Sequence, residues 1–189
     1  MTSATRLIVI GGSAGSLQVM FKLFAGMDDR YPIPVVIVVH RSHSIEPLLE
    51  ELLASRTKMR VREVEEKDTP EPGWLYICPP DYHLLFEEDG SFTLDYSEKI
   101  NFCRPSIDVS FQSAADVFGE NLVCILLSGA NADGAEGLAY VKQKNGITIV
   151  QDPNEAEVSY MPQMALQRKQ TDHVLGTNGI RSFLESLKV

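Results

Sequence analysis

Short apolar runs alternate with amphipathic segments along the 189 residues of the chain. The runs Leu7–Gly12, Ile33–His40 and Leu122–Gly129 are almost continuously apolar, which is typical of strands buried on both faces. Between such runs, segments such as Leu17–Met27 repeat apolar residues at helical spacing. This alternation predicts an α/β fold of three layers, in which helices cover both faces of a doubly wound, mostly parallel sheet.

One segment departs from the alternation. Residues 83–96 contain two strand-like stretches separated by the turn pair Asp89-Gly90, which predicts an inserted β-hairpin. We find no linker, internal repeat or low-complexity stretch in the sequence. We therefore expect a single domain over residues 1–189.

Composition and charge narrow the function classes. The net charge of −9 and the pI of about 4.9 disfavour nucleic-acid binding, because an acidic chain repels phosphate backbones. No apolar run approaches the roughly 20 residues that span a bilayer, and the N-terminus lacks a signal-peptide pattern. Cys78, Cys103 and Cys124 are scattered, which favours buried thiols in a reducing compartment. We expect a cytoplasmic protein with no membrane insertion, no metal and no cofactor.

Three polar side chains follow the ends of predicted strands. Ser13 follows the first strand, His40 the second, and Asp133 lies beyond Gly129 where a helix begins. Ligands of such sheets bind beyond the carboxyl ends of the strands. A serine hydroxyl becomes a nucleophile when imidazole takes its proton, and a carboxylate orients the imidazole. The three residues therefore indicate a catalytic triad for hydrolysis.

Each of the three residues also has a structural interpretation. Ser13 is suited to cap the helix that begins near Gly15, and Asp133 to cap the helix that follows it. His40 is also consistent with an ordinary loop histidine, and His43 competes with it for any role. These alternatives remain open at the level of sequence.

Phosphate binding is a weaker interpretation of the first glycine-rich turn. Ser13 occupies the place of the second glycine of a dinucleotide-binding fingerprint, no carboxylate follows the second strand, and a P-loop lysine is absent. The stretch "GGSAG" fits the G-x-S-x-G nucleophile elbow. The order Ser, His, Asp nevertheless differs from the Ser, acid, His order of α/β-hydrolases.

The sequence resembles the catalytic domain of the bacterial chemotaxis protein-glutamate methylesterases. That family carries I-G-A-S-T-G-G at its nucleophile, Q-H-M at its histidine and L-T-G-M-G-x-D-G-A-x-G at its aspartate, where this chain reads "IGGSAGS", "VHR" and "LLSGANADGAEG". The resemblance continues through "CPPDYHL", "RPSIDVSFQSAA" and "MPQMAL".

The resemblance implies a function and a set of site residues. The implied reaction is hydrolysis of γ-glutamyl methyl esters on the cytoplasmic helices of methyl-accepting chemoreceptors, with deamidation of receptor glutamines as a related activity. It implies Ser13 as nucleophile, His40 as general base and Asp133 as its orienting carboxylate. The resemblance also implies that the N–H of Ala14 and the loop around Ala130 lie near the oxyanion. The substrate cleft is then expected to include Arg104 and Met161.

Several positions depart from the family pattern. Ala14 replaces Thr, Ala130 replaces a bulky Met and so widens the expected pocket, and Arg41 replaces Met beside the histidine. Asn131 replaces Gly, and we expect a left-handed backbone there because Asn tolerates it. Family members commonly carry an N-terminal receiver domain, and we expect none here. These departures leave two alternatives open: an esterase or amidase of the same fold with another substrate, or a non-catalytic relative.

Overall fold

The computed structural model describes residues 5–40 and 47–187. Seven strands form one sheet, in which every strand pairing is parallel. Their order across the sheet is β3 (Arg60–Glu63), β4 (Trp74–Ile77), β2 (Val35–Val39), β1 (Leu7–Gly12), β7 (Leu122–Leu126), β8 (Ile147–Gln151) and β9 (His173–Leu175). The fold is therefore the α/β architecture that the alternating pattern predicts.

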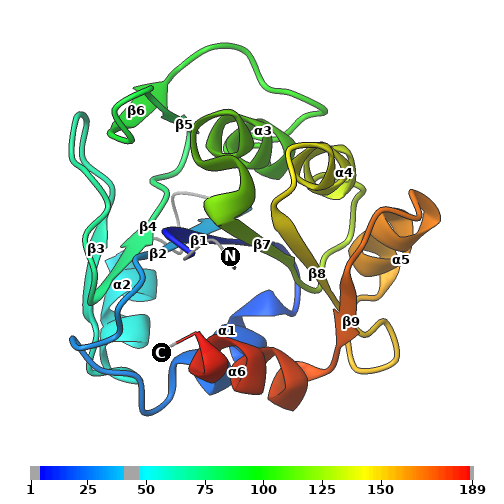
Figure 1. Cartoon of the computed structure of the whole chain (residues 1–189), viewed down its shortest axis with the longest axis horizontal. Coiled ribbons are helices and arrows are strands. Elements are labelled where there is room, and N and C mark those ends of the chain that lie inside the picture. Colours follow the sequence, from blue (N-terminus) through cyan, green and yellow to red (C-terminus); the bar gives the residue numbers. More distant parts are fainter. Residues whose placement is uncertain (1–4, 41–46, 188–189) are drawn as a thin grey trace.

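Helices cover both faces of this sheet (Figure 1). One face carries α1 (Ser16–Phe24), α2 (Pro47–Ala54) and α6 (Thr177–Ser186), and the other carries α3 (Ile107–Phe118), α4 (Ala135–Gln143) and α5 (Tyr160–Gln167). Successive residues of β1 point to opposite faces, so Leu7 and Val9 enter one core and Ile8 and Ile10 the other. This two-sided burial explains why the strands are continuously apolar.

The predicted hairpin is present outside the main sheet. It consists of β5 (His83–Phe86) and β6 (Phe92–Asp95), which pair antiparallel. Its Phe86 packs edge-on against Phe118 at the end of α3, with the ring centroids 5.7 Å apart. A 3₁₀ turn at Gly119–Asn121 then leads from α3 into β7. The hairpin therefore extends the core beneath α3.

The sheet changes winding direction at β1. From β1 the chain forms β2, β3 and β4 on one side, with β4 between β2 and the edge strand β3, and later β7, β8 and β9 in order on the other side. The carboxyl end of β1 is consequently flanked by the ends of β2 and β7. This is the topological switch point at which open α/β sheets bind their ligands.

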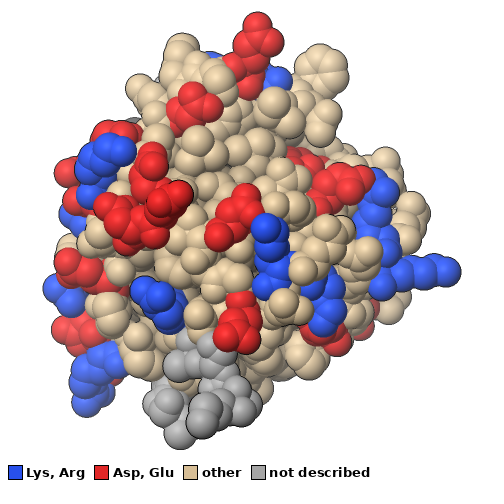
Figure 2. Space-filling model, turned by 45° about the horizontal axis from the view of Figure 1, so that its top comes forward, with Lys and Arg blue, Asp and Glu red and all other residues tan. Residues whose placement is uncertain are grey.

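The outer surface carries both signs of charge. On the face shown in Figure 2, Lys and Arg side chains lie among Asp and Glu side chains, so this face does not present a field of one sign. Within the described ranges, no helix combines the length and the apolar character that a membrane span requires.

Candidate active site

Backbone hydrogen bonds tie together the three strand ends at the switch point. Ser13 N–H donates to the carbonyl of Ser128 (2.9 Å), and His40 N–H donates to the carbonyl of Gly12 (3.3 Å). The turns after β2 and β7 are therefore both anchored to the turn after β1. The fold thus places Ser13 between the segments that carry His40 and Asp133.

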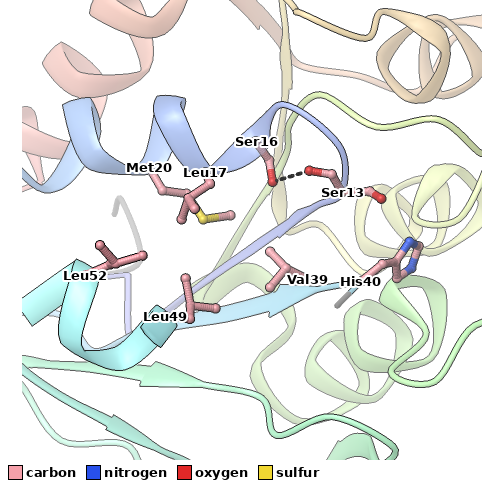
Figure 3. A pocket seen from close by; sticks show the side chains of 8 residues that line it. All are labelled: Ser13, Ser16, Leu17, Met20, Val39, His40, Leu49 and Leu52. Carbon is pink, nitrogen blue, oxygen red and sulfur yellow. Dashed lines mark hydrogen bonds between the residues drawn. The ribbon is translucent and has the colours of Figure 1, made fainter. Parts of the chain in front are cut away.

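Ser13 lies in a tight turn and does not cap the following helix. Helix α1 begins at Ser16, its N-cap is Gly15 with φ 80°, and no side chain caps it. The Ser13 carbonyl accepts hydrogen bonds from the N–H (3.0 Å) and the hydroxyl (2.6 Å) of Ser16. A side chain at Gly15 would be strained by the left-handed backbone and would crowd the hydroxyl of Ser128. The capping interpretation of Ser13 is therefore wrong, and its hydroxyl points toward the ring of His40 (Figure 3).

His40 makes a short hydrogen bond to the predicted acid. Its Nε2 lies 2.6 Å from Oδ2 of Asp133, and the Asp133 side chain is almost completely buried. Asn131 defines the tautomer. Its Oδ1 accepts from the N–H of Asp133 (3.0 Å), which turns its Nδ2 toward Nδ1 of His40 at 3.4 Å. Because Nδ1 faces a donor, it accepts, and the ring proton lies on Nε2.

Asn131 thus acts through its side chain rather than through its backbone. The prediction of a left-handed backbone at this position is wrong, because Asn131 is not among the residues with positive φ. Its side chain instead contacts the histidine, the N–H of Asp133 and, at 3.4 Å, the sulfur of Cys103. A glycine at this position would provide none of these contacts.

The Asp133 carboxylate accepts four hydrogen bonds within the protein. Besides His40, its donors are the hydroxyl of Ser106 (2.9 Å) and the N–H groups of Ile107 (2.7 Å) and Asp108 (3.0 Å). Burial opposes ionisation, but the hydrogen bonds from His40 and from the two N–H groups outweigh it, so the pKa of Asp133 lies below its ordinary value. Asp133 is therefore an anion suited to orient and stabilise a protonated imidazole.

Asp133 does not cap the helix that follows it. The N-cap of α4 is Gly134, with no side-chain hydrogen bond, and the Asp133 carboxylate receives the first N–H groups of α3 instead. The prediction that Asp133 caps α4 is therefore wrong. Asp133 instead stabilises the N-terminus of α3, which begins 26 residues earlier in the chain.

Cys103 lies beside these residues and is only partly buried, so the prediction of a buried thiol is wrong at this position. One ligand atom from each of His40, Cys103 and Asp133 lies within 4.8 Å of the other two. Burial, and then the charge of Asp133, raise the pKa of Cys103, which disfavours the thiolate that a metal binds. With the carboxylate also occupied by four donors, this group is arranged for hydrogen bonding rather than for metal binding.

The remaining predicted residues lie in different surroundings. Ala14 and Ala130 are exposed at the rim, on the turns after β1 and β7. Arg104 stacks over the ring of Tyr96 at 4.0 Å and donates to the carbonyls of Tyr96 and Ser97. Met161 is fully buried beneath the turn at Gly129, whose carbonyl accepts its N–H. His43 and Arg41 lie outside the described residues.

An apolar pocket of about 160 Å³ opens beside Ser13 and His40. Helix α1 contributes Leu17 and Met20, and α2 contributes Leu49 and Leu52 (Figure 3). The side chains of Ser13 and His40 therefore lie at one end of a hydrophobic pocket. This arrangement suits a substrate whose polar reacting group is flanked by apolar groups.

Comparisons with known proteins identify the family of this chain. A family model described as CheB methylesterase matches residues 8–184. A protein of Leptospira interrogans is 39% identical over 173 residues, which cover 92% of this chain and 90% of that protein. The protein-glutamate methylesterase/protein-glutamine glutaminase of Thermotoga maritima is 31% identical, and the match covers 90% of this chain and 50% of that protein.

The fold is also similar to a solved structure. The crystal structure of the Thermotoga maritima CheB methylesterase catalytic domain superposes with a TM-score of 0.92 at 30% identity, covering 97% of this chain and 99% of that chain. The family model, the relatives and the shared fold lead to one conclusion: the chain belongs to the CheB methylesterase family.

Proposed function

We propose that this protein is a serine hydrolase that removes methyl groups from glutamate γ-methyl esters on the cytoplasmic helices of methyl-accepting chemoreceptors. Deamidation of receptor glutamines is the related activity, since ester and amide pass through the same acyl-enzyme. The observation that carries the proposal is the hydrogen bond of 2.6 Å between His40 Nε2 and Asp133, beside the hydroxyl of Ser13. Relatives that bear the methylesterase and glutaminase names support the choice of substrate.

The proposed chemistry follows from the tautomer of His40. Nδ1 of His40 takes the proton of the Ser13 hydroxyl as Oγ attacks the ester carbonyl, and Asp133 stabilises the resulting imidazolium through Nε2. The imidazolium then gives its proton to the departing methoxide, which leaves as methanol. Water, deprotonated by the same nitrogen, hydrolyses the acyl-serine to glutamate and restores Ser13.

The oxyanion of each tetrahedral intermediate needs donors near Ser13. Ala14 N–H is suited to this role because it follows the nucleophile directly and has no acceptor among the described residues. The turn that holds Ala130 faces the same rim, since Ser13 N–H is bound to Ser128. We assign Ala14 and the turn around Ala130 to oxyanion binding. The apolar pocket beside Ser13 and His40 would hold the side chains that flank the esterified glutamate on the receptor helix.

The experiment is methanol release from methylated receptor membranes. We expect Ser13→Ala to lose at least about 10³-fold in rate while keeping the wild-type circular dichroism spectrum. Ser55→Ala is the matched control, because Ser55 is an exposed serine at the end of α2 whose hydroxyl bonds only to a local carbonyl. Equal methanol release by Ser13→Ala and wild type would refute the proposal. Hydrolysis of small esters without methanol release from receptors would indicate an esterase with the same mechanism and another substrate.

A further inference from the structure

A second buried carboxylate lies next to Asp133. Asp108, in the first turn of α3, accepts hydrogen bonds from the N–H groups of Gly134 (2.9 Å) and Gly137 (2.6 Å) at the start of α4. Asp133, just before α4, accepts from the N–H groups of Ile107 and Asp108 at the start of α3. Each helix therefore supplies the carboxylate that satisfies the other. We call Asp108, Asp133 and these four N–H donors the carboxylate clasp.

The clasp requires very close contact between the two helices. A Cβ atom at Gly137 would lie 2.8 Å from Cα of Asp108 and 2.9 Å from its carbonyl oxygen, so only glycine fits there. Asp108 and Asp133 are 7% and 4% exposed, and neither carboxylate is screened by bulk water. The position of Asp133, and with it the imidazole of His40, therefore depends on Asp108 holding the first turn of α4.

The charges of the clasp are unequal. Burial raises the pKa of Asp108 to about 6, and the charge of Asp133 adds to this effect against the hydrogen bonds from Gly137 and Gly134. Asp133 remains ionised because its own donors favour the anion. Other titratable groups near the clasp are His40 on Asp133, the thiol of Cys103, and His83, whose Nδ1 accepts from the N–H of Ser106.

We propose that Asp108 is a positioning residue of this site, which fixes the Asp133 carboxylate toward His40 and adds a second negative charge that strengthens the imidazole as a base. The proposal rests on the proposed function for its kinetic consequences only. Its electrostatic consequence concerns the titration of His40 and is measurable without substrate.

Asp108→Asn separates these effects, because an Asn oxygen still accepts from Gly134 and Gly137 while the negative charge is lost. We expect the imidazole titration of His40, followed by proton NMR, to shift toward lower pH by about half a unit, since a nearby negative charge favours the imidazolium. The acidic limb of the kcat/KM profile for methanol release should shift equally, with KM unchanged. Asp108→Ala, which also removes the acceptor, should lower kcat by about tenfold or more.

Asp116→Asn is the matched control. Asp116 also lies on α3 and joins it to α4, through Tyr140 and Lys144, but it is exposed and lies about two helical turns beyond Asp108. We expect this variant to keep the wild-type titration and profile. If Asp108→Asn titrates like wild type, the proposal is overturned.

If Asp108→Asn does not fold, carbon-13 NMR of the wild-type aspartate carboxyls decides the question. A titration step shared by Asp108 and the ring of His40 supports the proposal, and independent steps overturn it. The two proposals can fail separately. If wild-type protein releases no methanol, but the His40 titration differs between wild type and Asp108→Asn, the proposed function is refuted and this inference stands.

Discussion

Replacing Ser106 by Ala tests whether the site depends on the hydrogen bonds to the buried acid. Ser106 is the N-cap of α3 and is fully buried. Its hydroxyl donates to Oδ1 of Asp133 (2.9 Å) and accepts from the N–H of Val109 (3.4 Å). The substitution removes both contacts and leaves the other three donors of Asp133 in place.

The magnitude follows from these two contacts. A hydrogen bond to a charged group stabilises by about 1.5–3 kcal/mol, and loss of an N-cap with a long contact costs about 0.5 kcal/mol. The free energy of unfolding should therefore fall by about 2–3.5 kcal/mol at pH 7.5. The Asp133 carboxylate also loses one of the four donors that stabilise its charge and hold it toward His40. We therefore expect kcat to change more than KM.

Urea denaturation of Ser106→Ala at two pH values is the assay. The pKa of Asp133 is lowered in the folded protein, so the stability that its hydrogen bonds provide is present above its unfolded value of 3.8 and is lost as the pH falls through the lower folded value. The difference between wild type and Ser106→Ala should therefore shrink as the pH falls below 3.8.

Ser113→Ala is the control for this experiment. The Ser113 hydroxyl, also on α3, bonds the backbone of Phe86 and contacts no carboxylate. Its loss should reduce stability by about 1 kcal/mol independently of pH. If Ser106→Ala and Ser113→Ala have the same stability at both pH values, the bond to Asp133 contributes nothing and the reasoning fails.

Two further substitutions test the same region. Gly137→Ala places a methyl group 2.8 Å from Cα of Asp108, so we expect a loss of about 2 kcal/mol or more and a melting temperature lower by at least about 4 °C; an unchanged melting temperature in calorimetry would contradict the close helix contact. Asn131→Ala removes the amide that faces Nδ1 of His40, so kcat for methanol release should fall by roughly 3- to 10-fold at constant KM. A change in KM alone would assign Asn131 to substrate binding instead.

Much of the fold and the candidate triad follow from local sequence features. Continuous apolar runs identify the central strands, because a parallel sheet is buried on both faces, and polar residues directly after such runs lie at the functional edge. Ser13, His40 and Asp133 were predicted in this way. The structure brings His40 and Asp133 into contact, and their catalytic roles stay a prediction.

The supporting residues were not predictable in the same way. Ser106 and Asp108 lie on a helix start where capping by Ser is the ordinary interpretation, and no local pattern shows that they also face Asp133. Asn131 was interpreted through its backbone, whereas its amide makes the decisive contacts. These functions arise from tertiary contacts across more than 20 residues of sequence. The sequence offers only a serine and an aspartate two residues apart at the start of one helix, and a D-G-x-x-G stretch at Asp133 much later in the chain. Neither shows that the two segments meet.

The strand order shows what His40 and Asp133 must overcome to meet, because the strands that precede them, β2 and β7, are not adjacent in the sheet. Neighbouring strands lie about 4.8 Å apart, so the ends of β2 and β7, on either side of β1, are separated by about 10 Å. Ser13 lies between these two ends, because it directly follows β1. The side chain of Asp133, which follows β7, has to extend toward β2 to contact His40. If Asp133 capped its own helix, its carboxylate would lie over the N-terminus of α4 instead. Binding Asp133 to the start of α3 turns the carboxylate away from α4 and toward His40. The clasp is therefore the means by which this sheet brings the outer two members of the site together.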